Sequence, residues 1–191
     1  MKNSDKMKDN KISHKSKGED LVVQPKNDAA SELKDLFIDS LKDIYWAENA
    51  LIGVLPKMVA NATAPSLQSA INEHLKVTKI QITRLEDVFN FLGEKAEGKK
   101  CEAMAGLIKE GDSILEETQP GAVRDAGIIA ASQKIEHYEI ATYGTLVAFA
   151  KTLGENDIAK LLSKNLAEEK EADCVLNDVA LNSVNIKAVR D

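Results

Sequence analysis

The stretch KDIYWAENALIGVLPK, residues 42–57, decides the fold because its apolar residues recur with the period of an amphipathic helix. Extended in both directions, the pattern advances in steps of four and three: Phe37, Leu41, Ile44, Glu48, Leu51, Leu55 and Met58. All of these except Glu48 are apolar and should face a core. A carboxylate in the middle of a buried stripe requires a partner, since burying it alone costs many kcal/mol.

Three other stretches have the same period, so we expect four long helices. They cover residues 29–60, with Asp28 or Ser31 as the N-terminal cap, then Pro65 or Ser66 to Leu92, the segment from Gly121 to Gly154, and residues 156–181. A shorter helix is predicted over 102–117, between the second and third long helices.

The links between these helices indicate the topology. The first and last links are only a few residues long, so each pair of helices must form an antiparallel hairpin. The long segment between the pairs can travel the length of a bundle and let the third helix run parallel to the second. We therefore predict an all-α, ferritin-like four-helix bundle of two antiparallel hairpins, joined by a long crossover that contains a short helix.

Each of the other three long helices also interrupts its apolar stripe near its centre. The interrupting residues are His74, Thr78 and Gln81 in the second helix, Glu136 and Glu139 in the third, and Glu169 and Asp173 in the fourth. At about 1.5 Å of rise per residue, these groups and Glu48 reach a similar depth from the turns of their hairpins. We therefore expect them to meet in one layer.

A layer of five acids needs a compensating charge. The inner stripes offer one base, His74, and no lysine or arginine, while Glu168 and Glu171 are expected to face solvent. A divalent cation, or a pair of them, is the simplest solution. Carboxylates with one histidine suit iron or manganese. The predicted metal ligands are Glu48, His74, Glu136, Glu139, Glu169 and Asp173, and no catalytic side chains are assigned.

Composition restricts the class of protein further. The 191 residues are 43% hydrophobic and 4% aromatic, with a net charge of −6, which favours a helical domain and disfavours a nucleic-acid surface. No apolar run has the length of a signal peptide or a membrane span, and Cys101 and Cys174 form no scaffold or metal-binding pattern. We expect a protein without a membrane or nucleic-acid partner, cytoplasmic if bacterial.

The net charge is unevenly distributed along the chain. Residues 1–18 have a balance of +4, which leaves −10 for the remainder, and they contain almost no large apolar residues. We expect residues 1–28 to form a disordered, lysine-rich tail, residues 29–182 to form the bundle, and residues 183–191 to form a short C-terminal tail.

Four segments resemble the YciF/YciE-type stress proteins of the ferritin-like superfamily. They are LKDLFIDSLKDIYWAENALIGVLPKM (33–58), EKAEGKKCEAMAGLIKEG (94–111), AASQKIEHYEIATYGTL (130–146) and LAEEKEAD (166–173). The resemblance covers about residues 31–180. It implies a ferritin-like domain, often a homodimer, in a bacterial stress response. In related proteins, di-iron or di-manganese centres handle ferrous iron, oxygen or peroxide.

Position by position, the resemblance assigns metal-ligand roles to the six residues named above, with one departure from the family pattern. Where the family commonly has His-Leu-Glu-Glu-Thr, this chain has His74-Leu75-Lys76-Val77-Thr78, so Val77 stands in place of a glutamate. The layer could then hold one ion rather than two, use Gln81 as a weak neutral ligand, or hold none.

Two alternatives to metal chemistry follow. The polar layer could be a hydrogen-bonded network of carboxyl groups, His74 and a tyrosine such as Tyr143, in a non-enzymatic stress protein that acts through dimerisation or a partner. The basic tail could instead recruit an anionic surface to the acidic bundle.

Overall fold

The described part of the chain, residues 22–189 of a computed structural model, is helical and contains no strand. Its elements are α1 (Leu33–Asn61), α2 (Pro65–Leu92), α3 (Glu102–Glu117), α4 (Ala122–Thr152), α5 (Asn156–Val179), the π-helical turn η2 (Ala180–Val184) and α6 (Asn185–Ala188). The predicted all-α class is confirmed. None of these helices is long and apolar enough to cross a membrane.

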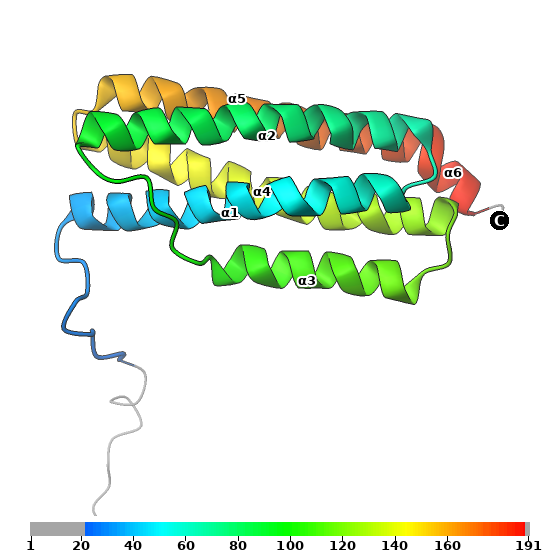
Figure 1. Ribbon diagram of the computed structural model, residues 1–191, viewed down its shortest axis with the longest axis horizontal. Coiled ribbons are helices and arrows are strands. Elements are labelled where there is room, and N and C mark those ends of the chain that lie inside the picture. The colour runs from blue at the N-terminus through cyan, green and yellow to red at the C-terminus, as the bar shows by residue number, and fades with distance from the viewer. Residues whose placement is uncertain (1–21, 190–191) are drawn as a thin grey trace, which may run out of the picture. The chain divides into compact units, whose positions relative to one another are not determined.

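The four long helices pack as two antiparallel hairpins, as predicted. α1 and α2 form one hairpin and α4 and α5 the other, while α1 packs on α4 and α2 on α5 (Figure 1). The colour sequence in Figure 1 shows that α4 runs in the direction of α2, so every pair of neighbours in this ring is antiparallel. Residues from all four helices therefore reach a common interior.

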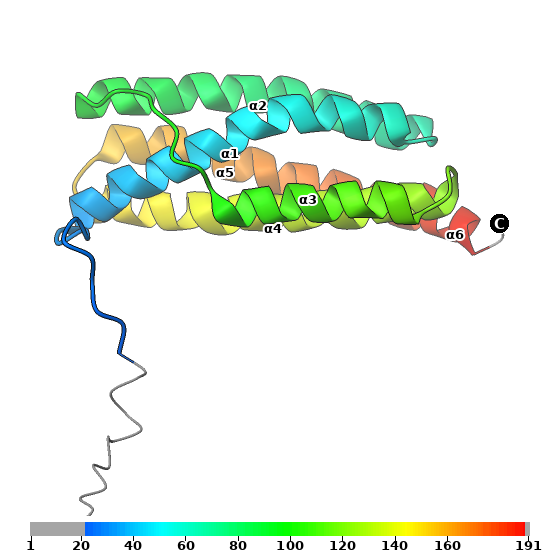
Figure 2. The same cartoon turned by 60° about the horizontal axis from the view of Figure 1, so that its bottom comes forward.

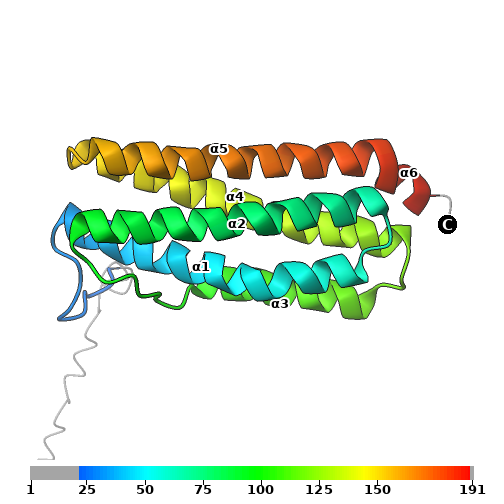
Figure 3. The same cartoon turned by 45° about the horizontal axis from the view of Figure 1, so that its top comes forward.

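The crossover between the hairpins passes over α1 and continues into α3, which lies outside the ring against α4 and α1 (Figures 2 and 3). The Lys99 backbone N–H donates to the Lys42 carbonyl at 3.0 Å, which fastens the crossing segment to α1. Gly98 is needed at this crossing, because a Cβ built on it would lie 3.1 Å from the Cβ of Trp46.

The ends of the bundle differ from the expected boundaries. α1 begins at Leu33 rather than at residue 29, and the Asp35 carboxylate accepts from the Glu32 backbone N–H at 3.3 Å. Residues 183–188, expected to be part of a tail, instead continue the helical path, because Val184 is buried and η2 and α6 pack against α4. The expectation of a disordered tail falls mainly on residues 1–21, which lie outside the described residues; residues 22–30 form no helix.

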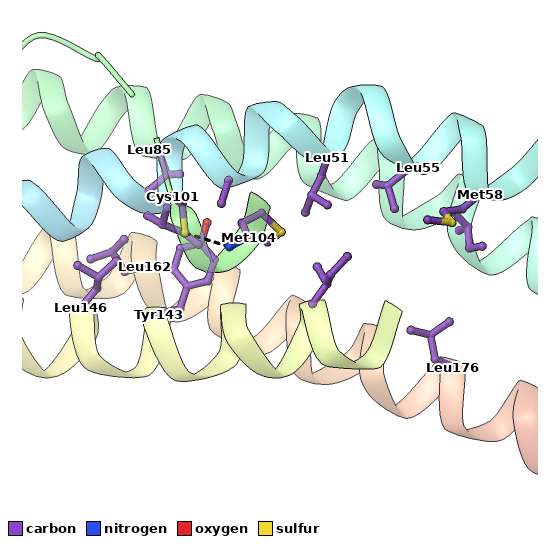
Figure 4. Packing of buried hydrophobic residues seen from close by; sticks show 14 of the residues in the cluster. Leu51, Leu55, Met58, Leu85, Cys101, Met104, Tyr143, Leu146, Leu162 and Leu176 are labelled. Carbon is purple, nitrogen blue, oxygen red and sulfur yellow. Dashed lines mark hydrogen bonds between the residues drawn. The ribbon is translucent and has the colours of Figure 1, made fainter. Parts of the chain in front are cut away.

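The predicted stripe of α1 is buried throughout, including Glu48. In α4, steps of four and three through Glu136 predict that Gln133 and Ile140 face the core, but both are only partly buried, whereas Ser132, Ile135 and Glu139 are buried. The reason is that α4 contacts α1, α5 and α3, so more than one face of this helix is covered. Figure 4 shows Leu146 and Leu162 on one side of Tyr143 along the bundle, and Leu51, Leu55 and Leu176 on the other.

One buried acid holds the two hairpins together at the end where α1 turns into α2. Asp125, in the first turn of α4, accepts from the Thr63 N–H and hydroxyl at 2.7 Å each, and from the Ala64 N–H at 2.8 Å. Ala64 precedes α2, so the carboxylate also lies near the positive end of that helix dipole.

We expect Asp125→Ala to lower the free energy of unfolding by about 2–4 kcal/mol, because it leaves the buried Ala64 N–H and the two partly buried donors of Thr63 without their acceptor. Urea unfolding followed by circular dichroism measures this. Asp157→Ala is the matched control, since Asp157 pairs with Lys160 on the surface and its removal should change stability much less. Equal losses in the two variants would contradict this role for Asp125.

Candidate metal centre

A polar layer crosses the interior of the bundle, and every one of the four long helices contributes to it. Glu48 comes from α1, His74 from α2, Glu136 and Glu139 from α4, and Glu169 from α5. Glu48, Glu139 and Glu169 have no exposed surface, Glu136 is 2% exposed and His74 is 9% exposed. Apolar residues lie above and below these groups on each helix, so the layer is enclosed by core on both sides.

Four of these side chains form a compact set of possible ligands. One ligand atom from each of His74, Glu136, Glu139 and Glu169 lies within 4.8 Å of the others. His74 Nε2 is 3.5 Å from Glu136 Oε1 and 3.9 Å from Glu169 Oε2. A single cation placed among the four atoms would be within reach of all of them after small side-chain movements.

The donor atoms of the layer fit a hard or borderline divalent cation. Within the described residues, seven buried side-chain atoms lack a hydrogen-bond partner: Glu48 Oε2, His74 Nε2, Gln81 Oε1, Glu136 Oε2, both carboxyl oxygens of Glu139, and Glu169 Oε2. All seven belong to this layer. Buried polar groups are normally paired, and these unpaired oxygens with one imidazole nitrogen are donor atoms of the kind that ions such as iron or manganese accept.

The pKa values of the buried side chains also indicate that negative charge is unfavourable in this layer. Burial, followed by the charge of Glu169, raises the pKa of Glu48, Glu136 and Glu139 well above the usual value of a glutamate. Burial raises the pKa of Glu169 to about 7 and lowers that of His74 to about 4. Without a cation, burial therefore favours the protonated form of the first three acids and the neutral form of the imidazole.

Hydrogen bonds from neighbouring side chains orient two of the carboxyl groups. The Tyr143 hydroxyl donates to Glu48 Oε1, and the Gln81 amide donates to Glu169 Oε1. Asn165 Nδ2 in turn donates to the Tyr143 hydroxyl at 3.0 Å. Each bond occupies one oxygen of its carboxyl group and leaves the other, Glu48 Oε2 or Glu169 Oε2, without a partner.

Sequence reasoning missed an arginine that lies close to this layer. Arg84 Nη1 donates to Asn165 Oδ1 at 2.8 Å, and its Nη2 donates to Glu168 Oε1 at 2.7 Å. Glu168, which we expected in solvent, is therefore an ion-pair partner and only partly exposed. The spacing could have indicated this, since Arg84 lies three residues after Gln81 and Glu168 is next to Glu169. Because Arg84 is paired with Glu168, its charge is not free to neutralise the ligand set.

Two of the predicted ligands lie outside the compact set. Glu48 is buried in the same layer, and its charge contributes to the raised pKa of Glu136 and Glu139. Asp173 lies one turn beyond Glu169 and nearer the surface: it accepts from Gln133 Nε2 at 3.1 Å and is 3.5 Å from Nε2 of the exposed His137. The structure therefore brings Glu48 to the layer and directs Asp173 to its periphery.

Comparisons with known proteins agree with this architecture. The Escherichia coli K12 protein YciF is 45% identical over 157 residues, which is 82% of this chain and 95% of that protein. Its crystal structure, that of a stress protein, matches with a TM-score of 0.78 over 82% of this chain and 99% of the other, at 43% identity. YcfI from Rhodopseudomonas palustris matches with the same TM-score and coverage at 45% identity.

A more distant structure, from Xanthomonas campestris, shares the fold with a TM-score of 0.67 at 21% identity, and covers 83% of this chain and 98% of that one. The family model described as "Domain of unknown function (DUF892)" matches residues 32–189, which is the whole of the helical bundle. The chain therefore belongs to the DUF892 family of YciF-type proteins.

Proposed function

We propose that this protein binds iron or manganese in the core of its bundle and acts as a metal-dependent stress protein. His74, Glu136, Glu139 and Glu169 would be the ligands, with Glu48 as a further carboxylate if a second ion binds. The observation that supports this most strongly is the set of seven unpaired polar atoms in one buried layer. A bound ion would supply redox chemistry toward oxygen or peroxide.

The chain's own residues would prepare the site for the ion. Tyr143 and Gln81 each hold one oxygen of a carboxyl group and leave the second oxygen directed at the layer. The lowered pKa of His74 keeps the imidazole neutral and able to bind metal at neutral pH. The leucines on either side exclude water, which strengthens attraction between the carboxylates and a cation. Asp173 would have to leave Gln133 to join them, so we place it outside the ligand set.

A second candidate is a metal-free structural or interaction protein. Val77, in place of the glutamate that the family pattern commonly has, favours it, because one expected ligand is missing. In this case the acids stay protonated and the layer serves only to hold the helices in register. Homodimerisation, which the family resemblance implies, is a prediction shared by both candidates.

The two candidates predict different metal contents. We expect the full chain, purified without chelator and dialysed against Mn²⁺ or anaerobic Fe²⁺, to retain the ion. Glu139→Gln should weaken binding by more than about tenfold, because it removes a ligand charge and changes the shape very little. Glu116→Gln, on the exposed surface of α3, is the control. Equal metal contents in Glu139→Gln and the wild type, or no metal in the wild type, would contradict the proposed centre.

Stability should respond to pH in opposite directions with and without metal. The four buried glutamates have a raised pKa in the folded chain. Their contribution to stability is fully present below pH 4.5, the usual pKa of a glutamate, and is lost as the pH rises through the raised pKa, which is about 7 for Glu169. His74 acts in the opposite sense: its contribution is present above pH 6.5 and is lost as the pH falls through about 4. Because the acids outnumber this histidine, we expect the chelator-treated chain to be more stable in urea at pH 5.5 than at pH 7.5.

Metal binding requires deprotonated carboxylates, so saturating Mn²⁺ should reverse this trend and stabilise the chain most at pH 7.5. Glu139→Gln should reduce the pH dependence of the metal-free chain, because the amide does not titrate. Metal-free stability that rises steadily from pH 5.5 to 7.5 would show that the buried acids are not protonated.

A further inference from the structure

A cavity of about 180 Å³ between α2 and α5 ends at two of the proposed metal ligands. Seven apolar side chains line most of it: Leu55, Ala70, Ile71, Val77, Ala172, Val175 and Leu176. Leu55, Ile71 and Leu176 are buried, whereas Val175 is 38% exposed. The buried residues thus form the inner wall, and the cavity opens to solvent beside Val175.

The inner end of the cavity is polar. His74 and Glu136 both line it, and each has a buried atom without a hydrogen-bond partner among the described residues, namely His74 Nε2 and Glu136 Oε2. Ser132, which is also buried, lies beside them. A mostly apolar pocket with a few convergent polar atoms at one end is the usual form of a small-molecule site.

The outer rim restricts the charge of the ligand. Glu73, Glu168 and Glu171 belong to the lining, which includes no lysine or arginine. Lys76 pairs with Glu73 and Arg84 pairs with Glu168, so the rim has little excess charge. An anion would find no lysine or arginine in the lining to pair with, so an uncharged molecule fits this lining best.

Val77 gives the pocket its apolar character. It lies one helical turn from His74 and is half-buried in the cavity wall. A glutamate at this position would place a carboxylate among the apolar side chains. Val77 therefore has two effects: it replaces one expected metal ligand, and it provides an apolar wall beside the proposed metal centre.

We propose that this cavity binds a small uncharged apolar molecule, about as large as one aromatic ring, whose single polar group lies at the inner end of the cavity beside His74 and Glu136. The volume supports this size, since an apolar protein cavity of about 150 Å³ is sufficient for benzene. As a substrate site the pocket rests on the proposed metal centre, because its inner end is formed by two proposed ligands. As a binding site it does not need the metal.

Phenol is the probe that tests this pocket, because it is uncharged at neutral pH and has one hydroxyl on an apolar ring. Isothermal titration calorimetry on the full chain should give a dissociation constant on the order of 1 mM or tighter. Val77→Phe and, independently, Val175→Phe should each weaken binding at least tenfold by filling the cavity. Val123→Phe, at a position on α4 that is exposed and outside the pocket lining, is the matched control and should bind phenol normally.

Two further measurements fix the orientation and charge of the ligand. The imidazole ¹⁵N resonances of His74 should shift when phenol is added, and benzoate, which has the same ring with a negative charge, should bind at least tenfold more weakly. The inference is overturned if phenol does not bind, if Val77→Phe and Val175→Phe bind it as well as Val123→Phe, if the His74 resonances do not move, or if benzoate binds equally well.

The titration is performed on chelator-treated chain and again after addition of Mn²⁺. If only the proposed metal centre is wrong, the chain will not retain Mn²⁺ but will still bind phenol. Failure of the pocket would appear as absent phenol binding in both samples, whatever the Mn²⁺ content.

Discussion

The structure depends on one constraint: several carboxyl groups are buried at a single level of a helical bundle, and they cannot all be ionised there without a cation. Glu48, Glu139 and Glu169 have no exposed surface, and Glu136 has almost none. Burial in an apolar surrounding raises the pKa of each, which favours the protonated carboxyl group when no metal is bound. A bound metal ion would favour the ionised carboxylate. If the proposed metal centre forms, protons and metal ions would therefore compete for the same oxygens.

The surrounding side chains define how the layer can respond to that competition. Tyr143 and Gln81 fix one oxygen each of Glu48 and Glu169, and the pair of Arg84 with Glu168 closes the outer side of the network through Asn165. One helical turn from His74, Val77 contributes an apolar side chain to the wall of the cavity. The side of the layer at Tyr143 and Asn165 is thus closed by hydrogen bonds. The side at His74 and Glu136 borders the cavity, through which a small molecule would approach.

Much of this could be predicted from the sequence, because the heptad-like stripes set both the burial of Glu48 and the level at which His74, Glu136, Glu139 and Glu169 meet. What periodicity could not predict depends on neighbours in space. The covering of α4 by α3 changed which of its residues are buried, and the burial of Val184 extended the last helix beyond its expected end. Asp173 has the correct spacing from Glu169, but Gln133 holds it at the periphery. Arg84 and Glu168 lie next to the stripes in sequence, which could have indicated that they are near the layer, but their pairing with each other depends on the packing of α2 on α5.

The most direct test of the metal centre is X-ray diffraction from crystals of the full chain soaked in Mn²⁺, with anomalous data collected at the manganese absorption edge. We expect an anomalous peak inside the bundle, within coordinating distance of His74 Nε2 and of carboxylate oxygens of Glu136, Glu139 and Glu169. Crystals saturated with Mn²⁺ that show no peak at this level, with the four side chains in the positions described above, would contradict it.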